Sequence, residues 1–211
     1  MIDTTSKLLD WFEIYGRDFP FRWRGDPFKI LVAGILLRQT QATQVASVFP
    51  RLVECYPTSR LLANANEESL RAILKPLGIT SRARSLVKIA QTLVKNYGGK
   101  VPRDYDELVK LPGVGDYIAS CVLAHGYGRL IPMVDVNVTR VLGRIYGEQR
   151  DIRRTYVDVC PKEAAEPFHY ALLDLGQLVC KHSNPKCDLC PVVEGCRQNK
   201  SQPNKGSLEP I

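Results

Sequence analysis

The chain has 211 residues, enough for one large domain or two small ones, with 45% hydrophobic and 24% charged residues. This balance is ordinary for a folded soluble protein, and the net charge of +7 is compatible with a polyanionic partner, most simply nucleic acid. No apolar run reaches the ~18 residues of a membrane span. The acids and aromatic residues at the N-terminus also differ from a signal peptide. We therefore expect no membrane association and a cytoplasmic protein, or a nuclear one in a eukaryote.

The hydrophobic pattern has a helical period along almost the whole chain, so the sequence predicts an all-α fold. Ser6 is the expected N-cap of the first helix, and Asp26 with Pro27 marks the start of the second. We find no strand alternation, hairpin turn or internal repeat. The polar tail, 199–211, is expected to be disordered. The expected helical segments cover residues 6–16, 26–56, 66–74, 81–99, 104–111, 137–147 and 168–180.

Residues 105–128 are expected to form a helix, a tight turn and a second helix. In the turn, Gly113 and Gly115 flank Val114; both glycines allow positive φ and leave no Cβ to block a close approach. Asp116 can cap the second helix. Backbone N–H groups at such a helix start form a ready site for an anion, here a nucleic-acid phosphate. The alternative is a plain corner between two helices that carries a glycine stop.

Four of the seven cysteines crowd together near the C-terminus, with the spacing C-x6-C-x2-C-x5-C. They are Cys180, Cys187, Cys190 and Cys196. Four thiolates this close can bind a tetrahedral zinc ion or a [4Fe–4S] cluster, and the spacing leaves both open. A secreted disulfide framework would spread its cysteines along the chain. The remaining three are expected to be ordinary buried thiols, and they are Cys55, Cys121 and Cys160.

An acid, Asp135, lies inside an otherwise apolar run, 20 residues after Gly115. The simpler interpretation is an N-terminal helix charge or cap before the helix over 137–147, a role that Asn137 could share. The functional interpretation is a carboxylate in a cleft of low dielectric. There it would stabilise a cationic transition state or activate a water molecule.

Three features occur together and in order: LPGVG at 111–115, VDVNVTRV at 134–141, and the four cysteines. With the segments 16–41 and 174–196, they make nearly the whole chain resemble the endonuclease III superfamily of helix-hairpin-helix DNA glycosylases. The resemblance implies two helical domains that flank a DNA-binding cleft. It also implies a [4Fe–4S] cluster on the four cysteines and a catalytic role for Asp135. The implied domains are a six-helix barrel over 22–132 and an iron–sulfur domain built from 1–21 with 133–198.

Tyr117 indicates the branch of this superfamily. Bifunctional members have a lysine two residues after the second glycine, which forms a Schiff base with the sugar and permits strand cleavage. The phenol of Tyr117 cannot form that adduct. Thymine-DNA mismatch glycosylases have tyrosine there, and the run LLRQT is also similar to theirs. The resemblance therefore implies a monofunctional glycosylase that excises thymine or uracil opposite guanine and leaves an abasic site.

Adenine-DNA glycosylases acting on A:G or A:8-oxoguanine are the first alternative. They usually have serine at the position of Tyr117, glutamate at that of Gly34, and a further C-terminal domain, whereas this chain ends at residue 211. Some thymine glycosylases also keep an acid at the position of Gly34. Thymine leaves as an anion, however, and needs less acid help than adenine. The alternative of another class is a non-catalytic iron–sulfur DNA-binding protein, which has no use for a carboxylate such as Asp135 near phosphates.

The resemblance also implies how the protein engages its partner, double-stranded DNA that contains a mismatched or damaged base. A monomer would flip the target base out of the stack. Gln39, with Arg38 beside it, is expected to fill the vacated space, and Ile79 to wedge the opposite strand. Asp135 would stabilise the oxocarbenium-like sugar and orient or deprotonate water. Tyr117 would line the base pocket.

Overall fold

The computed structural model describes residues 3–22, 25–78 and 81–200. Over these ranges the chain forms helices and contains no strand, which confirms the all-α prediction. The chain divides into two compact units: unit 1 is Met1–Arg17 with Pro132–Ile211, and unit 2 is Asp18–Ile131. Their assignment as an iron–sulfur domain and a six-helix barrel stays a prediction.

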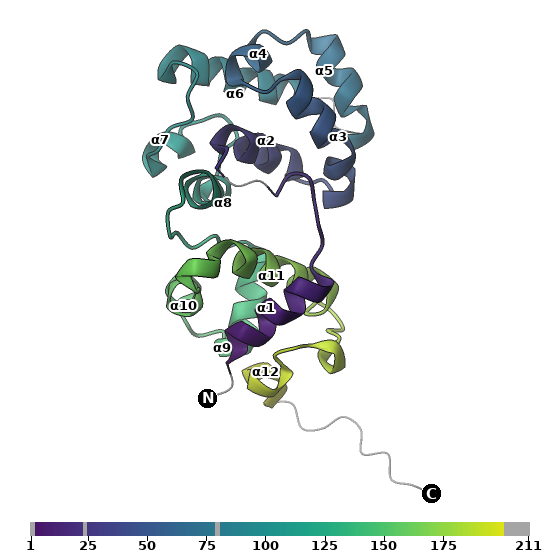
Figure 1. The fold of residues 1–211 in the computed structure, drawn as a ribbon, viewed down its shortest axis with the longest axis vertical. Helices are drawn as coiled ribbons and strands as arrows, with labels where there is room; N and C mark the ends of the chain where they lie inside the picture. Colours follow the sequence, from purple (N-terminus) through teal and green to yellow (C-terminus); the bar gives the residue numbers. More distant parts are fainter. Residues whose placement is uncertain (1–2, 23–24, 79–80, 201–211) are drawn as a thin grey trace, which may run out of the picture. The chain divides into compact units, whose positions relative to one another are not determined.

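Unit 2 is built from helices that surround the apolar helix α2 (Figure 1). Asp26 caps α2 by accepting hydrogen bonds from the N–H groups of Phe28 and Lys29, both at 3.1 Å. Because α2 has neighbours on most sides, seven of its 11 residues are buried and none is fully exposed. Its helices are α2 (Pro27–Leu37), α3 (Ala42–Cys55), α4 (Ser59–Ala63), α5 (Glu67–Leu74), η1 (Lys75–Leu77), α6 (Ser81–Tyr97), α7 (Tyr105–Val109), α8 (Asp116–Cys121) and η2 (Val122–Gly126).

The segment over 26–56 is interrupted where the sequence predicts continuous helix. Helix α2 ends at Leu37, and α3 begins only after a turn in which Gln39 has a left-handed φ of +54°. Two carbonyls at the end of α2 accept hydrogen bonds from Arg82 of α6, which lies far away in the sequence. The break therefore depends on a long-range contact that local periodicity does not contain.

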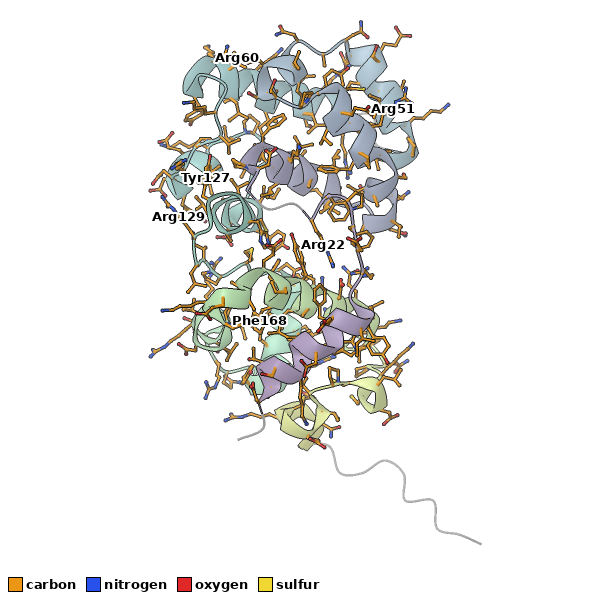
Figure 2. The ribbon with its side chains drawn as sticks, in the orientation of Figure 1. Arg22, Arg51, Arg60, Tyr127, Arg129 and Phe168 are labelled. Atoms are coloured by element: carbon orange, nitrogen blue, oxygen red, sulfur yellow. The ribbon has the colours of Figure 1, made fainter. Side chains whose placement is uncertain are left out.

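Unit 1 combines the N-terminal helix with helices from the last third of the chain. Helix α1 packs against α11, and α11 packs against α9. Figure 2 shows Phe168 of α11 directed into this unit, where it is 1% exposed and meets Tyr156 edge-on at 5.7 Å. The helices are α1 (Thr4–Tyr15), α9 (Val136–Tyr146), α10 (Ile152–Val159), η3 (Lys162–Ala164), α11 (Ala165–Leu178), η4 (Cys187–Leu189), η5 (Val193–Gly195) and α12 (Arg197–Lys200).

The start of α1 differs from the prediction. Asp3 is the N-cap, because its carboxylate accepts hydrogen bonds from the N–H groups of Thr5 and Ser6 at 3.1 Å. Ser6, the expected cap, lies inside the first turn, and its hydroxyl donates to the same carboxylate. A carboxylate accepts from two N–H groups and complements the helix dipole, so it displaces the serine.

Three further expectations concern the tail, the isolated thiols and membranes. Residues 199 and 200 close α12, and the rest of the predicted tail, 201–211, lies outside the described residues. Cys160 is buried as predicted, but Cys121 is only partly buried and Cys55 is exposed, so that prediction is wrong for two thiols. No helix in the described ranges has the length and apolar character needed to cross a membrane.

A buried ion pair joins the end of α1 to α11. Asp174 is fully buried, and it accepts hydrogen bonds from Nη2 of Arg17 at 2.6 Å and Nε at 3.0 Å. The backbone N–H of Arg17 donates to the same carboxylate at 2.8 Å. The negative charge of Asp174 is thus compensated by the guanidinium of Arg17. A buried carboxylate requires such a paired cation.

Replacing Asp174 by alanine removes the acceptor of three hydrogen bonds from Arg17, whose side chain is only 27% exposed. We expect Asp174→Ala to lower the free energy of unfolding by about 3–5 kcal/mol, measured by urea titration with circular dichroism. The exposed pairs of Glu67 with Arg71 and Arg84 provide the control. Glu67→Ala should cost under about 1 kcal/mol. Equal losses in the two variants would contradict a special role for the buried pair.

Candidate functional site

The predicted corner between two helices is present in unit 2. Leu111 and Val114 are 2% and 6% exposed, and the N–H of Val114 donates to the carbonyl of Leu111 at 3.1 Å. Gly113 has a φ of +79°, a conformation that glycine adopts without a Cβ penalty. Helix α8 begins three residues later, at Asp116. This is the helix-hairpin-helix arrangement that the sequence predicts.

Gly115 has no such conformational reason to be glycine. Its φ of −101° and ψ of 179° are open to any residue, so the prediction of positive φ is wrong here. A Cβ built on Gly115 would meet no heavy atom within 4 Å. Gly115 also takes the cap position, and Asp116, the predicted cap, is the first residue of α8. The fold itself does not require glycine at 115, and the bare backbone is open to a close approach from outside the chain.

Tyr117 is the second residue of α8 and is partly buried. Ile118, which follows it, is buried against α2. A Cβ built on Gly34 would lie 3.0 Å from Cγ2 of Ile118, closer than real Cβ contacts normally come. The missing side chain at Gly34 therefore lets α8 pack tightly on α2, and a glutamate there would have to displace Ile118.

The turn after α2 holds two of the predicted DNA-contacting residues. Arg38 and Gln39 are both exposed. Nη1 of Arg38 donates to the carbonyl of Gly113 at 3.2 Å, so this turn is joined to the hairpin. Arg82, 6% exposed, donates to the carbonyls of Leu36 and Arg38. Burial, with a smaller effect from the Arg38 charge, lowers the pKa of the Arg82 guanidinium. Ile79, the predicted wedge, lies outside the described residues.

Asp135 of unit 1 is the N-cap of α9, which confirms the simpler interpretation of this residue. Its Oδ1 accepts hydrogen bonds from the N–H groups of Asn137 at 2.8 Å and Val138 at 2.7 Å. Its Oδ2 accepts from Nδ2 of Asn137 at 2.9 Å. The carboxylate is partly buried and fixed in one orientation. A role as cap does not exclude a role in chemistry, because the oxygens keep further lone pairs.

Helix α9 also connects Asp135 to the cysteine segment. Arg140, one turn further along, donates from Nη2 to Oδ1 of Asn137 and to the carbonyl of Gly176, both at 2.8 Å. Its Nε donates to the carbonyl of Cys180 at 2.9 Å. A continuous chain of hydrogen bonds therefore runs from the Asp135 carboxylate to the first of the four clustered cysteines.

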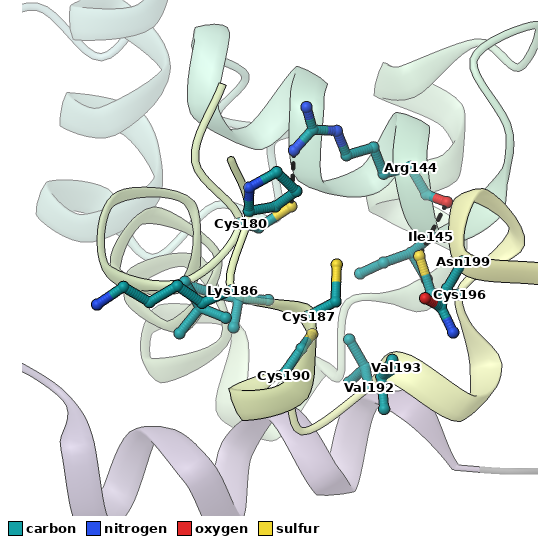
Figure 3. A pocket seen from close by; sticks show the side chains of 13 residues that line it. Arg144, Ile145, Cys180, Lys186, Cys187, Cys190, Val192, Val193, Cys196 and Asn199 are labelled. Carbon is teal, nitrogen blue, oxygen red and sulfur yellow. Dashed lines mark hydrogen bonds between the residues drawn. The ribbon is translucent and has the colours of Figure 1, made fainter. Parts of the chain in front are cut away.

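The four clustered cysteines line a single pocket in unit 1 (Figure 3). The pocket walls are otherwise mainly apolar, with Ile145, Leu175, Val179 and Val192 among them. Nη1 of Arg144 lies 3.5 Å from Sγ of Cys180, and the thiol of Cys196 donates to the Arg144 carbonyl at 3.3 Å. A cation next to the sulfur atoms favours thiolate ligands.

Thiols in this pocket are unfavourable as free thiolates. Burial raises the pKa of Cys190 to about 11, and burial followed by the neighbouring thiols raises the pKa of Cys187. Bound metal reverses this effect, because it compensates the negative charge. Among the described residues, no three His, Cys, Asp or Glu side chains are close enough to share one metal ion.

Sequence reasoning identified the residues that bear the candidate chemistry but missed those that hold them. Nothing in the sequence distinguishes three arginines, Arg82, Arg140 and Arg144, from ordinary basic residues. Each donates to backbone carbonyls of a segment distant in sequence. For Arg140 and Arg144 the local signal was arginine within a largely apolar helical stretch, which is also how a solvated charge looks. Arg82, in the run SRARS, carried no such signal.

Comparison with known proteins identifies the family. A model of the HhH-GPD superfamily of base excision DNA repair proteins matches residues 32–162. The chain belongs to this superfamily. The thymine-DNA glycosylase of Aeropyrum pernix is 38% identical over 203 residues, covering 90% of this chain and 91% of that protein. The thymine/uracil-DNA glycosylase of Pyrobaculum aerophilum is 38% identical over 199 residues, covering 88% and 86%.

A relative named for another activity and two solved structures are also similar to this chain. The adenine DNA glycosylase of Mycobacterium tuberculosis is 35% identical, and the match covers 89% of this chain but 65% of that protein. Among solved structures, a thermostable thymine-DNA glycosylase has a TM-score of 0.84 and 28% identity, covering 93% and 94% of the two chains. Endonuclease III trapped covalently on DNA has a TM-score of 0.76 and 30% identity, with the same coverage.

The two hairpin glycines should respond differently to a methyl group. Gly113→Ala forces alanine into left-handed backbone and brings its Cβ to 2.9 Å from Nη1 of Arg38. We expect it to lower the free energy of unfolding by about 1–2 kcal/mol, measured by urea titration. Gly115→Ala should lower it by less than about 1 kcal/mol, because only the N-cap preference for glycine over alanine is lost. A larger loss at Gly115 would show that the fold, and not an outside contact, requires that glycine.

Proposed function

We propose that this HhH-GPD protein is a monofunctional DNA glycosylase that excises thymine or uracil opposite guanine. The observation that carries the proposal is the likeness over about nine-tenths of the chain to two glycosylases whose names state thymine or uracil activity. The product is an abasic site, formed by hydrolysis of the N-glycosidic bond. The arrangement of the candidate residues supports each step.

The partner is double-stranded DNA that contains a mismatched base. Gly113, Val114 and Gly115 present bare backbone at the start of α8, where a phosphate oxygen can accept from N–H groups. The missing side chain at Gly115, which the fold does not need, supports this contact. The net charge of +7 favours approach to a polyanion. Gln39 fills the space of the flipped base, with Arg38 beside it, and Ile79 wedges the opposite strand.

Asp135 is the catalytic carboxylate. Its orientation is fixed by two backbone N–H groups and by Asn137, and a fixed negative group costs no reorganisation during the reaction. As the bond to the base breaks, the carboxylate stabilises the positive charge that develops on the sugar. It also orients or deprotonates the attacking water. The non-catalytic DNA-binding alternative leaves this carboxylate without a purpose beyond its cap.

Tyr117 lines the base pocket by stacking or by a hydrogen bond to the base. Its phenol has no amine to attack the sugar, so the reaction stops at the abasic site. Gly34 argues against the adenine alternative, because the place of an acid that would protonate adenine is closed by Ile118. Thymine and uracil leave as anions and need no such acid.

The cofactor is a [4Fe–4S] cluster held by the four cysteines Cys180, Cys187, Cys190 and Cys196. Four cysteines line one pocket, and four thiolates are the ligand set that a [4Fe–4S] cluster takes. When bound, the cluster supplies iron–thiolate bonds that fix the segment between 180 and 196. Arg144 and Arg140 hold that segment against α9. We further propose a monomer, in the cytoplasm or in the nucleus of a eukaryote.

Replacing Asp135 by asparagine separates its two roles. Asparagine caps a helix about as well as aspartate, so the free energy of unfolding should change by less than about 0.5 kcal/mol. Thymine release from a T:G duplex in single-turnover reactions should fall by at least about a hundredfold, while DNA binding persists. Asp151→Asn, at the cap of α10 in the same unit, is the matched control and should retain activity. Full activity of Asp135→Asn would remove Asp135 from the mechanism.

Replacing Tyr117 by lysine introduces the missing amine. If residue 117 lies beside the reacting sugar, Tyr117→Lys should form a covalent adduct with a T:G duplex that borohydride traps, and the unmodified protein should form none. Denaturing gel electrophoresis measures the adduct. Tyr105→Lys, on α7, controls for adventitious adducts. An adduct with the unmodified protein would overturn the monofunctional assignment.

A further inference from the structure

The end of α2 is closed by an unusual donor. The last carbonyls of a helix lack partners within it and are commonly satisfied by a glycine turn. Here the guanidinium of Arg82 reaches across from α6 and donates to the carbonyls of Leu36 and Arg38. Arg82 is 6% exposed, so the guanidinium is held in the interior at this end of α2.

The turn that Arg82 holds contains a backbone outlier. Among the described residues, positive φ occurs at glycines and at two others, Gln39 and Asn184. Asparagine tolerates this conformation, but glutamine pays the full Cβ penalty. Gln39 is exposed, so no packing of its side chain explains its presence. A strained backbone conformation persists only where the surrounding structure enforces it, and such residues are common at functional sites. The strain therefore indicates that the Gln39 side chain has a function.

The hydrogen bonds of Arg82 are also connected to the hairpin through Arg38. Arg38 accepts from Arg82 through its carbonyl, and its own Nη1 donates to the carbonyl of Gly113 at 3.2 Å. Arg82 is the second residue of α6. Its buried guanidinium is thus linked to the Gln39 turn and, through Arg38, to the hairpin.

We propose that Arg82 is a positioning residue for base flipping: it holds Gln39 in its left-handed conformation, so that the side chain enters the stack as the base leaves. This inference rests on the proposed function, because it deepens the role assigned to Gln39. Arg82 itself touches no reacting atom. Its contribution is pre-organisation, since the backbone that carries the Gln39 side chain already has the required conformation before the DNA is bound.

The test measures opening of the duplex separately from chemistry. A T:G duplex with 2-aminopurine next to the mismatch brightens when the target base leaves the stack. Arg82→Met removes the donors but keeps an apolar stem; we expect opening and single-turnover thymine release both to slow about ten- to a hundredfold. Arg82→Lys keeps the charge without the fork and should fall between Arg82→Met and the parent. Binding to a fully matched duplex should change less than about threefold, because phosphate contacts remain.

Arg84→Met is the matched control, since Arg84 lies on the same helix, is 73% exposed and pairs only at the surface with Glu67. It should leave opening unchanged. Circular dichroism melting excludes unfolding; should Arg82→Met fail to fold, Arg82→Lys carries the test. Unaltered opening in a folded Arg82 variant would overturn the proposal.

A double-mutant cycle identifies what Arg82 positions. Gln39→Gly removes the side chain and the backbone strain together, so Arg82→Met added to it should slow opening by less than about twofold. An undiminished effect would show that Arg82 acts through something other than Gln39, and would overturn the proposal. A parent protein that opens the duplex but releases no thymine would instead refute the proposed function and leave this inference standing.

Discussion

Two backbone N–H groups at the start of α9 donate to the carboxylate of Asp135, at 2.8 and 2.7 Å. The other end of the same helix carries Arg144, whose guanidinium lies 3.5 Å from the sulfur of Cys180. Between them, Arg140 joins Asn137 to the carbonyl of Cys180. The candidate catalytic carboxylate and the cysteine pocket are therefore positioned by one rigid element. Residues of α9 thus contact both groups, and a change in α9 should affect both.

Unit 2 shows a second constraint of the same kind. Its exposed candidates, Gln39 and the hairpin backbone, belong to turns, and turns hold functional groups only when a scaffold fixes them. The scaffold here is α2, closed at its end by Arg82 and packed against α8 through Gly34. The same close packing that fixes α8 also removes the room for an acid at position 34. A larger residue at position 34 would therefore require Ile118 to move.

Much of this could be read from the sequence because its signals were local. Helical periodicity, the two hairpin glycines, the cysteine spacing and the aspartate before α9 each lie within a few residues, and each appears where predicted. The predictions that failed depended on distant contacts. The break after Leu37 needs Arg82, and the exposure of Cys55 depends on how α3 packs. At Ser6, an acid three residues earlier competed for the cap. Gly115 differs again, because no steric or φ requirement among the described residues calls for glycine there, and the contact that we propose for it is with DNA.

The central claim is that this protein releases a mispaired pyrimidine and stops at the abasic site. The most direct measurement incubates the cluster-containing protein with an end-labelled T:G duplex and compares samples with and without hot alkali, beside U:G, A:G, A:8-oxoguanine and alkylated duplexes. The account predicts strand breaks at T:G and U:G that appear only after alkali. Strand breaks without alkali would contradict the monofunctional assignment. Release confined to the adenine duplexes, or from none of them, would contradict the proposed substrate class.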